Sequence, residues 1–249
     1  MPDLQLENSR IHYEVHGTGY PLVAFAPGFL SSRIERWRTN PSNPGKPQNF
    51  VDPIEALSEH FQVVVLDIRN AGTSRGSIGP NDSWNSYVSD FTALVDHLGI
   101  ARAHVMGACI GVTFAFALAQ ARPGLASAIV LQNPIGLHGN RAAIEAELND
   151  WEARVREYPE VEVANIAGFR ERMFANDFLF AISREFVAEC KLPILLMPGD
   201  DTMHPKPVSD EIIQLAPQTK VVSPWKGDDH KHAAMEQVRN FLIQHEPKH

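Results

Sequence analysis

Short runs of apolar residues recur along the chain, separated by longer segments that carry apolar residues at helical spacing. The continuous runs lie at 22–26, 63–66, 103–106, 128–131 and 194–197. Continuous apolarity is typical of central parallel strands that are covered on both faces. Near the start, residues 4–6 and 11–15 instead alternate apolar and polar positions around Asn8 and Ser9, which predicts an antiparallel hairpin.

Helical periodicity marks three of the intervening segments. The clearest runs from 84 to 98, with Asp82 or Ser83 as its N-cap. A second helix is expected around 114–118, ending before the next proline, and a last one over about 233–244. A hairpin followed by alternating strands and helices predicts an α/β fold whose sheet is antiparallel at one edge.

Two stretches break this rhythm. Residues 31–49 are rich in Pro, Asn and Ser and predict a long surface loop. Residues 137–191 contain no strand-like run but show helical patches at 141–157 and 169–189, which predicts a helical cap inserted between two strands. The expected organisation is therefore a core of residues 1–136 and 192–249 with a cap of residues 137–191.

Composition narrows the possible partners and compartments. The chain has 249 residues, a net charge of -8 and 44% hydrophobic residues, which favours a single folded domain and argues against nucleic acid and anionic membranes. The N-terminus lacks the features of a signal peptide, and no window resembles a membrane span. Two cysteines, Cys109 and Cys190, exclude a disulfide scaffold and favour a reducing, cytoplasmic location. Their spacing offers no zinc site.

The strongest chemical signal is the sequence Gly-Ala-Cys-Ile-Gly at 107–111, between a predicted strand and a predicted helix. A G-x-S-x-G segment in this context forms a sharp turn that exposes its central residue as a nucleophile. A thiol suits that place, because the thiolate is the reactive species and a helix N-terminus lowers its pKa. The amide of Ile110 would then face a developing oxyanion. The alternative is a buried core cysteine with no chemical role.

With this motif the chain resembles the α/β-hydrolase family, and the resemblance covers nearly all of it. Residues 26–29, Ala-Pro-Gly-Phe, resemble the family's His-Gly loop with proline in place of histidine, which implies the amide of Phe29 as the second oxyanion donor. Residues 67–74 resemble a structural turn of the family, with Asn70 where glycine is usual. The fold implied is a mostly parallel eight-stranded sheet with flanking helices and a helical cap.

The same resemblance implies the partners of the nucleophile. Residues 196–205 resemble the family's loop that bears the catalytic acid, which favours Asp201, with Asp200 as the alternative. The histidine follows the acid in the family's chain order, and the segment before the last helix offers His230, with His232 as the alternative. His204 follows the acid loop and is expected either to line the pocket or to lie at the surface.

A Cys–His–Asp set also occurs in dienelactone hydrolase, whereas the long early loop and the cap look more like the esterase and C–C hydrolase branches. The implied function is hydrolysis of a small ester, thioester or lactone through an acyl-cysteine. The alternatives are C–C hydrolysis or acyl transfer in the same pocket, or a non-catalytic ligand-binding protein. Three cap residues, Trp151, Phe174 and Phe178, are expected to contact a small carbonyl substrate in an apolar pocket, although for any single cap residue packing onto the core is the favoured alternative. No metal or cofactor is implied, and the oligomeric state stays open.

Overall fold

The computed structural model describes residues 2–40 and 48–247. Within them one mixed sheet contains nine strands, in the order β1-β2-β4-β3-β6-β7-β8-β9 with β5 paired to β2. In chain order the strands are β1 (Asp3–Gln5), β2 (Ser9–His16), β3 (Tyr20–Phe25), β4 (Phe61–Leu66), β5 (Arg75–Gly76), β6 (Ala103–Ala108), β7 (Ala126–Gln132), β8 (Ile194–Met197) and β9 (Lys220–Val221).

The sheet is mostly parallel, as expected, but it contains nine strands and not the eight that the resemblance implied, because the short β5 adds a further partner to β2 at the antiparallel edge. β2 pairs antiparallel with β1, β4 and β5, and every pair from β4 to β9 is parallel. Each of the five continuous apolar runs coincides with a strand, with ends that differ by at most two residues. The central strands are mostly apolar because both of their faces are buried, with His104 in β6 and Gln132 in β7 as buried polar exceptions.

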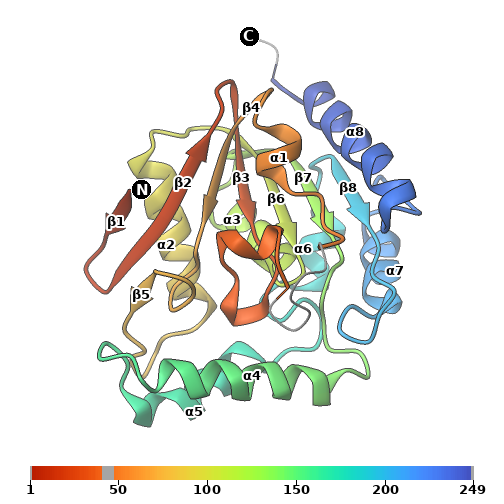
Figure 1. The fold of residues 1–249 in the computed structure, drawn as a ribbon. Coiled ribbons are helices and arrows are strands. Elements are labelled where there is room, and N and C mark those ends of the chain that lie inside the picture. The colour runs from red at the N-terminus through yellow and green to blue at the C-terminus, as the bar shows by residue number, and fades with distance from the viewer. Residues whose placement is uncertain (1, 41–47, 248–249) are drawn as a thin grey trace.

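Helices cover the sheet and one of its ends. They are α1 (Pro53–Leu57), α2 (Trp84–His97), α3 (Gly111–Ala121), α4 (Arg141–Val155), α5 (Ile166–Met173), α6 (Arg184–Glu189), α7 (Lys206–Leu215) and α8 (Asp228–Gln244), with the 3₁₀ turns η1 (Phe29–Ser31), η2 (Ile34–Trp37) and η3 (Val163–Asn165). α3 packs on β3, β6 and β7 and touches α2, whereas α1 packs on β4 and touches α8. Figure 1 shows α1 in front of the sheet and α3 behind it. No helix in residues 2–40 or 48–247 is long and apolar enough to cross a membrane.

Helix α2 illustrates how local sequence sets its own limits. Ser83 is the N-cap, its N–H donating to Ser86 Oγ at 3.3 Å, while that hydroxyl donates to Asp82 at 2.6 Å. Both residues considered as caps thus take part. The helix ends at His97, and Gly99 follows with a φ of 66°, a conformation that favours glycine.

The turn over residues 67–74 ties the early loop to the sheet. Asp67 accepts the amide of Ile34 at 2.9 Å and the amide of Thr73 at 2.9 Å. Asn70 has a φ of 62°, as its ability to adopt the left-handed region suggested. Arg69 makes two bonds to buried Asp90. The turn is structural, as the resemblance implied.

The prediction of a surface loop over residues 31–49 was wrong for its first part. Ser32, Ile34 and Trp37 are buried, because the hydrogen bond that the Ile34 amide donates to Asp67 holds η2 against the core. Residues 41–47 of this segment lie outside the described residues.

The segment between β7 and β8 is helical, as expected. Figure 1 shows α4 and α5 lying across one end of the molecule, and the rings of Trp151 and Phe169 stack between them at 5.4 Å. The indole of Trp84 in α2 donates to the carbonyl of Met173 at 2.6 Å. α6 instead packs on α7 of the core. A cap limited to residues 137–191 stays a prediction.

Candidate active site

Cys109 lies at the turn between β6 and α3, the context that its motif requires. Its φ is 57° and its side chain is buried. A Cβ on Gly107 would lie 2.0 Å from the carbonyl oxygen of Gly111, and one on Gly111 would lie 2.2 Å from that of Phe25. Only glycine allows strand, turn and helix to approach so closely.

Two backbone amides face the sulfur. The N–H groups of Gly28 and Ile110 act as hydrogen-bond donors that favour the thiolate. Ile110 is the N-cap of α3, where backbone N–H groups have no partner within the helix. The sequence named Phe29 for the other donor, but the amide facing the sulfur belongs to Gly28, one residue earlier. Phe29 lines the same cavity and has a φ of 55°.

The acid and a histidine come together in one short loop after β8. The Nδ1 of His204 lies 2.8 Å and 3.0 Å from the two carboxylate oxygens of Asp201, and the amide of His204 donates to the same carboxylate at 2.9 Å. A Cβ on Gly199 would lie 2.4 Å from the carbonyl oxygen of His204, so glycine permits this tight loop. Asp200 is exposed and pairs with Lys226 instead. The geometry therefore favours Asp201 over Asp200 as the partner of a histidine.

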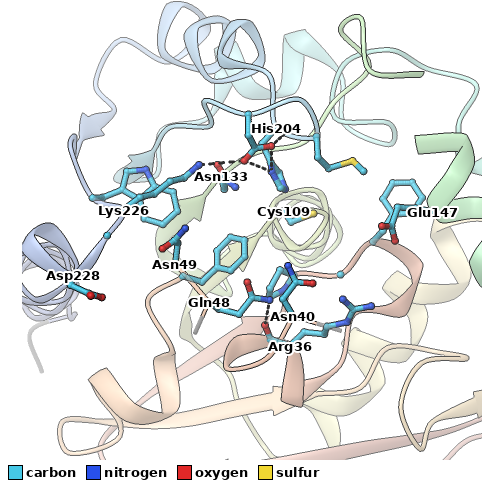
Figure 2. Close-up of a pocket in the computed structure, with 18 residues that line it drawn as sticks. Arg36, Asn40, Gln48, Asn49, Cys109, Asn133, Glu147, His204, Lys226 and Asp228 are labelled. Carbon is cyan, nitrogen blue, oxygen red and sulfur yellow. Dashed lines mark hydrogen bonds and ion pairs between the residues drawn. The ribbon is translucent and has the colours of Figure 1, made fainter. Parts of the chain in front are cut away.

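The imidazole of His204 reaches from Asp201 towards Cys109 (Figure 2). With Nδ1 held by Asp201, its Nε2 is buried and has no hydrogen-bond partner of good geometry in the described residues. The thiol and the imidazole nevertheless act strongly on each other. Burial raises the pKa of the Cys109 thiol, but the positive charge of His204 and its hydrogen bonding outweigh burial and lower that pKa below its usual value.

The pKa of His204 responds in the opposite direction. Burial lowers it, but the negative charge of Cys109 and the hydrogen bond that the imidazole donates to Asp201 raise it to about 9. The pKa of Asp201 lies far below its usual range, because the hydrogen bond with His204 overcomes the effect of burial. These two opposed shifts both favour the charged forms, a thiolate–imidazolium pair supported by a carboxylate.

His230 and His232 do not reach this cluster. The last helix was expected from about residue 233, but α8 begins at Asp228, because Gly227 precedes it and two acidic residues occupy its first turn. Both histidines are therefore on the helix and exposed, and His232 lies 3.7 Å from Glu236. The structure places His204, and not His230, beside the thiol.

A cavity of about 720 Å³ opens over Cys109. Its lining is mostly polar or charged, contrary to the apolar pocket that was expected. It comprises Pro27, Gly28, Phe29, Arg36, Asn40, Gln48, Asn49, Phe50, Cys109, Asn133, Glu147, Asp201, Met203, His204, Trp225, Lys226, Gly227 and Asp228.

Of the residues expected to contact substrate, only His204 belongs to this lining. Trp151 is fully buried against Phe169. Phe174 stacks on Phe29 at 4.9 Å, and the ring of Phe178 lies beneath the guanidinium of Arg184. These three residues serve packing, because each ring contacts a different neighbour away from the cavity or on its wall: Phe169, Phe29 and Arg184 respectively.

Several lining residues escaped the sequence reasoning. Arg36 and Gln48 belong to the segment interpreted as a surface loop, and Glu147 belongs to the cap helix α4. Asn133 directly follows β7 with a φ of 51°, and its side-chain oxygen is buried without a hydrogen-bond partner among residues 2–40 and 48–247. The position of Asn133 was accessible from the sequence, because side chains just after parallel strands gather at one edge of a sheet. Within the described residues no cluster of three or more His, Cys, Asp or Glu side chains could hold a metal ion.

Comparisons of sequence place the chain among known proteins. Residues 39–232 match the family described as alpha/beta hydrolase fold. A putative carbamate hydrolase RutD from Agrobacterium fabrum is 29% identical over 123 residues, which cover 49% of this chain and 43% of that protein. N-formylmaleamate deformylase from Pseudomonas putida is 28% identical over 199 residues, covering 77% and 66%. The match thus spans less than half of the carbamate hydrolase. These relatives give no support to a dienelactone-hydrolase branch.

Solved structures agree in fold. A meta-cleavage product hydrolase from Pseudomonas fluorescens has a TM-score of 0.67 at 19% identity, covering 95% of both chains. The enol-lactonase from Burkholderia xenovorans has a TM-score of 0.66 at 20% identity, covering 97% of this chain and 100% of that one. With residues 39–232 matching the family and the sheet order and the turn at Cys109 in accord, the chain belongs to the alpha/beta hydrolase fold family.

Proposed function

We propose that this hydrolase cleaves small carboxylic esters, thioesters or lactones through an acyl-cysteine intermediate on Cys109. The observation that carries the proposal is the position of His204, which contacts Asp201 through Nδ1 and turns its other nitrogen to the thiol. A nucleophile, a base and an orienting acid in this relation are the parts required for nucleophilic acyl transfer.

In the acylation step, the Cys109 thiolate attacks the substrate carbonyl and the carbonyl oxygen becomes an oxyanion. The amides of Ile110 and Gly28 stabilise that charge; one such donor is typically worth about 3–4 kcal/mol of barrier. The C–X bond then breaks, the leaving group takes the proton from His204, and the acyl group remains on sulfur. Asp201 holds the imidazole in orientation throughout.

Deacylation reverses the roles. Water attacks the thioester carbonyl while neutral His204 takes its proton. The carbon–sulfur bond breaks, the acid product leaves, and the imidazolium again faces a thiolate. No step uses His230. If another nucleophile attacks the acyl-cysteine in place of water, the reaction is acyl transfer, the alternative to hydrolysis in the same pocket.

A second candidate is cleavage of a C–N bond in an amide or carbamate. The raised pKa of His204, about 9, keeps the imidazole protonated at neutral pH, and an amine leaving group needs that proton. The names of the carbamate hydrolase and deformylase relatives point to the same bond type. C–C bond hydrolysis has its support in the fold shared with the meta-cleavage product hydrolase.

We also place the enzyme in a reducing compartment such as the cytoplasm. Cys109 and Cys190 are both free, and the mechanism requires a reduced thiol at position 109. The thiolate is the form that oxidants attack.

The test compares three variants on p-nitrophenyl esters and thioesters, with mass spectrometry of the intact protein. Cys109→Ala should abolish turnover and the acyl adduct. His204→Gln should lower kcat by about a thousandfold or more, the scale seen when a member of such a triad is removed. His230→Gln is the matched control and should keep wild-type kcat, since its side chain lies outside the cavity.

Loss of activity in His230→Gln together with retention in His204→Gln would overturn the assignment of the base. Full activity of Cys109→Ala would exclude the acyl-cysteine. Tight binding of carbonyl compounds with no turnover by the wild-type protein would favour a non-catalytic binding protein instead.

A further inference from the structure

Arg36 is a cation in the cavity that the proposed mechanism does not use. It belongs to η2 (Ile34–Trp37) and lines the same cavity as Cys109. Its side chain packs against the loop that faces the nucleophile, since a Cβ on Gly28 would lie 3.2 Å from both Cγ and Nε of Arg36. The Arg36 side chain therefore lies beside Gly28, whose amide is one of the two that face the sulfur.

The guanidinium of Arg36 has no acidic partner in the described part of the chain. Its Nε is buried and makes no hydrogen bond there. Neighbouring arginines are paired: Arg33 with Glu35 at 3.0 Å and Arg38 with Asp52 at 2.7 Å. A buried donor of a charged group is costly to leave without an acceptor, so this arrangement favours an anion from outside the protein.

The surrounding charge strengthens this tendency. Burial and the positive charges of Arg33 and Arg154 lower the pKa of Arg36, whereas Glu147 opposes that change. Arg154 donates to the hydroxyl of Ser31, not to a carboxylate. An added negative charge would relieve the repulsion among these guanidinium groups.

The carboxylates that line the cavity are engaged or distant. Asp201 contacts His204 and Lys226, and Asp228 lies across the cavity at the start of α8 (Figure 2). The charge of Glu147 acts on Arg36, but Arg36 forms no ion pair with it or with any other carboxylate in residues 2–40 and 48–247. Amide side chains of Asn40, Gln48 and Asn49 complete this polar side of the cavity.

We propose that Arg36 binds a carboxylate of the substrate, so that the preferred substrates are acyl compounds with a carboxylate a few bonds from the scissile carbonyl. A guanidinium binds a carboxylate with two parallel hydrogen bonds, which would fix the orientation of the carbonyl over Cys109. This inference rests on the proposed acyl chemistry for its substrate class, although the anion site itself can be tested without turnover.

The first experiment measures kcat/KM for two matched esters, the p-nitrophenyl monoester of glutaric acid and p-nitrophenyl pentanoate, with the uncatalysed rate subtracted from each. They have five-carbon acyl chains that differ in the terminal carboxylate. The wild-type enzyme should prefer the glutarate ester by about tenfold to a hundredfold, the range that hydrogen bonds to charged groups supply. Arg36→Gln should remove most of that preference and Arg36→Lys part of it.

Arg38→Gln is the matched control, because its guanidinium pairs with Asp52 outside the cavity; the preference should stay as in the wild type. If the wild-type enzyme shows no preference for the glutarate ester, or if Arg36→Gln retains it, the inference is wrong while the proposed acyl chemistry stands.

The second experiment separates the two proposals when neither ester is turned over. Cys109 is alkylated with iodoacetate, an anion, and with iodoacetamide, its neutral analogue, and the rates are measured by peptide mass spectrometry that distinguishes Cys109 from Cys190. The ratio of the iodoacetate rate to the iodoacetamide rate should fall at least about fivefold in Arg36→Gln and stay unchanged in Arg38→Gln. Equal ratios in the wild type and Arg36→Gln would refute an anion site at Arg36, whatever the outcome with the esters.

Discussion

Asp201 and His204 form a unit of three-residue spacing within one loop. The Asp201 carboxylate accepts hydrogen bonds from both the ring nitrogen and the backbone amide of His204. Asp201 therefore fixes the orientation of the imidazole and the backbone conformation of the loop. The proposed acid and base are therefore positioned together, without help from the start of α8. The proposed nucleophile, Cys109, comes from another part of the sheet, at the end of β6.

The coupling between Cys109 and His204 predicts how the imidazole titrates. The charge of Cys109 is the first of the causes that raise the pKa of His204 to about 9. In Cys109→Ser the hydroxyl stays neutral, so the pKa of His204 should fall by more than about one unit towards the ordinary value of about 6.5. NMR titration of the His204 ring measures this change in pKa. The spectrum of His230→Gln identifies the signal of the exposed His230. An unchanged pKa near 9 in Cys109→Ser would contradict the thiolate–imidazolium pair.

The same pair predicts the shape of the pH–rate profile. The pKa of the thiol is lowered and that of the imidazole is raised to about 9, so the reactive ion pair exists between the two values. The kcat/KM of the wild-type enzyme should fall on the acid side as the thiolate gains a proton, and on the basic side as pH rises through about 9. A stopped-flow or steady-state profile from pH 4 to 10.5 measures both limbs. A basic limb near 6.5 would contradict this assignment.

At the scale of elements, the nucleophile depends on a close crossing of strand β3, strand β6 and helix α3. Gly111 is the first residue of α3, and its added Cβ would lie 2.2 Å from the Phe25 carbonyl oxygen in the neighbouring strand. The atoms that would clash belong to the backbone, so no flexible side chain can move to relieve the contact. Both glycines of the motif, Gly107 and Gly111, are therefore required for the turn to form.

Gly111→Ala should therefore destabilise the protein by more than about 2 kcal/mol, the scale of a severe core clash. Urea unfolding measures the change in free energy. Gly79→Ala is the control, because its added Cβ would have its nearest neighbour at 3.5 Å, and its stability should stay close to the wild type. Equal stabilities of the two variants would mean that the α3 start can shift away from β3.

At the scale of the whole molecule, one buried histidine joins the sheet to the C-terminal helix. His104 in β6 lies between the rings of Tyr20 and Phe61, at 4.8 Å and 5.8 Å, and both of its nitrogens lack good partners in the described residues. Burial, and then the charge of His245 at the end of α8, lower the pKa of His104 to about 4, although a backbone bond to Leu242 opposes the shift.

This predicts a loss of global stability in acid. The folded state keeps His104 neutral, while the unfolded chain gains its proton near pH 6.5, so stability is complete above about 6.5 and is lost as pH falls towards 4. One such group contributes a slope of up to about 1.4 kcal/mol per pH unit. Urea unfolding of His104→Leu between pH 4 and 7 should show a smaller slope than the wild type. His60→Gln, at an exposed site, is the control, and an unchanged slope in His104→Leu would contradict the prediction.

The sequence by itself determined the architecture and the identity of two members of the cluster. Apolar runs fix parallel strands because burial of both faces leaves few other arrangements, and the five runs became β3, β4, β6, β7 and β8. The spacing of glycines around Cys109 located the turn of the proposed nucleophile for a similar local reason. Asp201 was implied by the resemblance of residues 196–205 to the family's acid-bearing loop, with Asp200 as the alternative.

The tertiary structure decided the histidine and the character of the cavity. His204 and His230 are both plausible by chain order, and only the start of α8 at Asp228, set by capping and helix-dipole effects, turns His230 away to solvent. Arg36 lines the cavity because the amide of Ile34 donates to Asp67, about thirty positions later in the chain, and this bond holds η2 against the core. Such placements depend on contacts between residues distant in the chain, which a local sequence pattern does not predict.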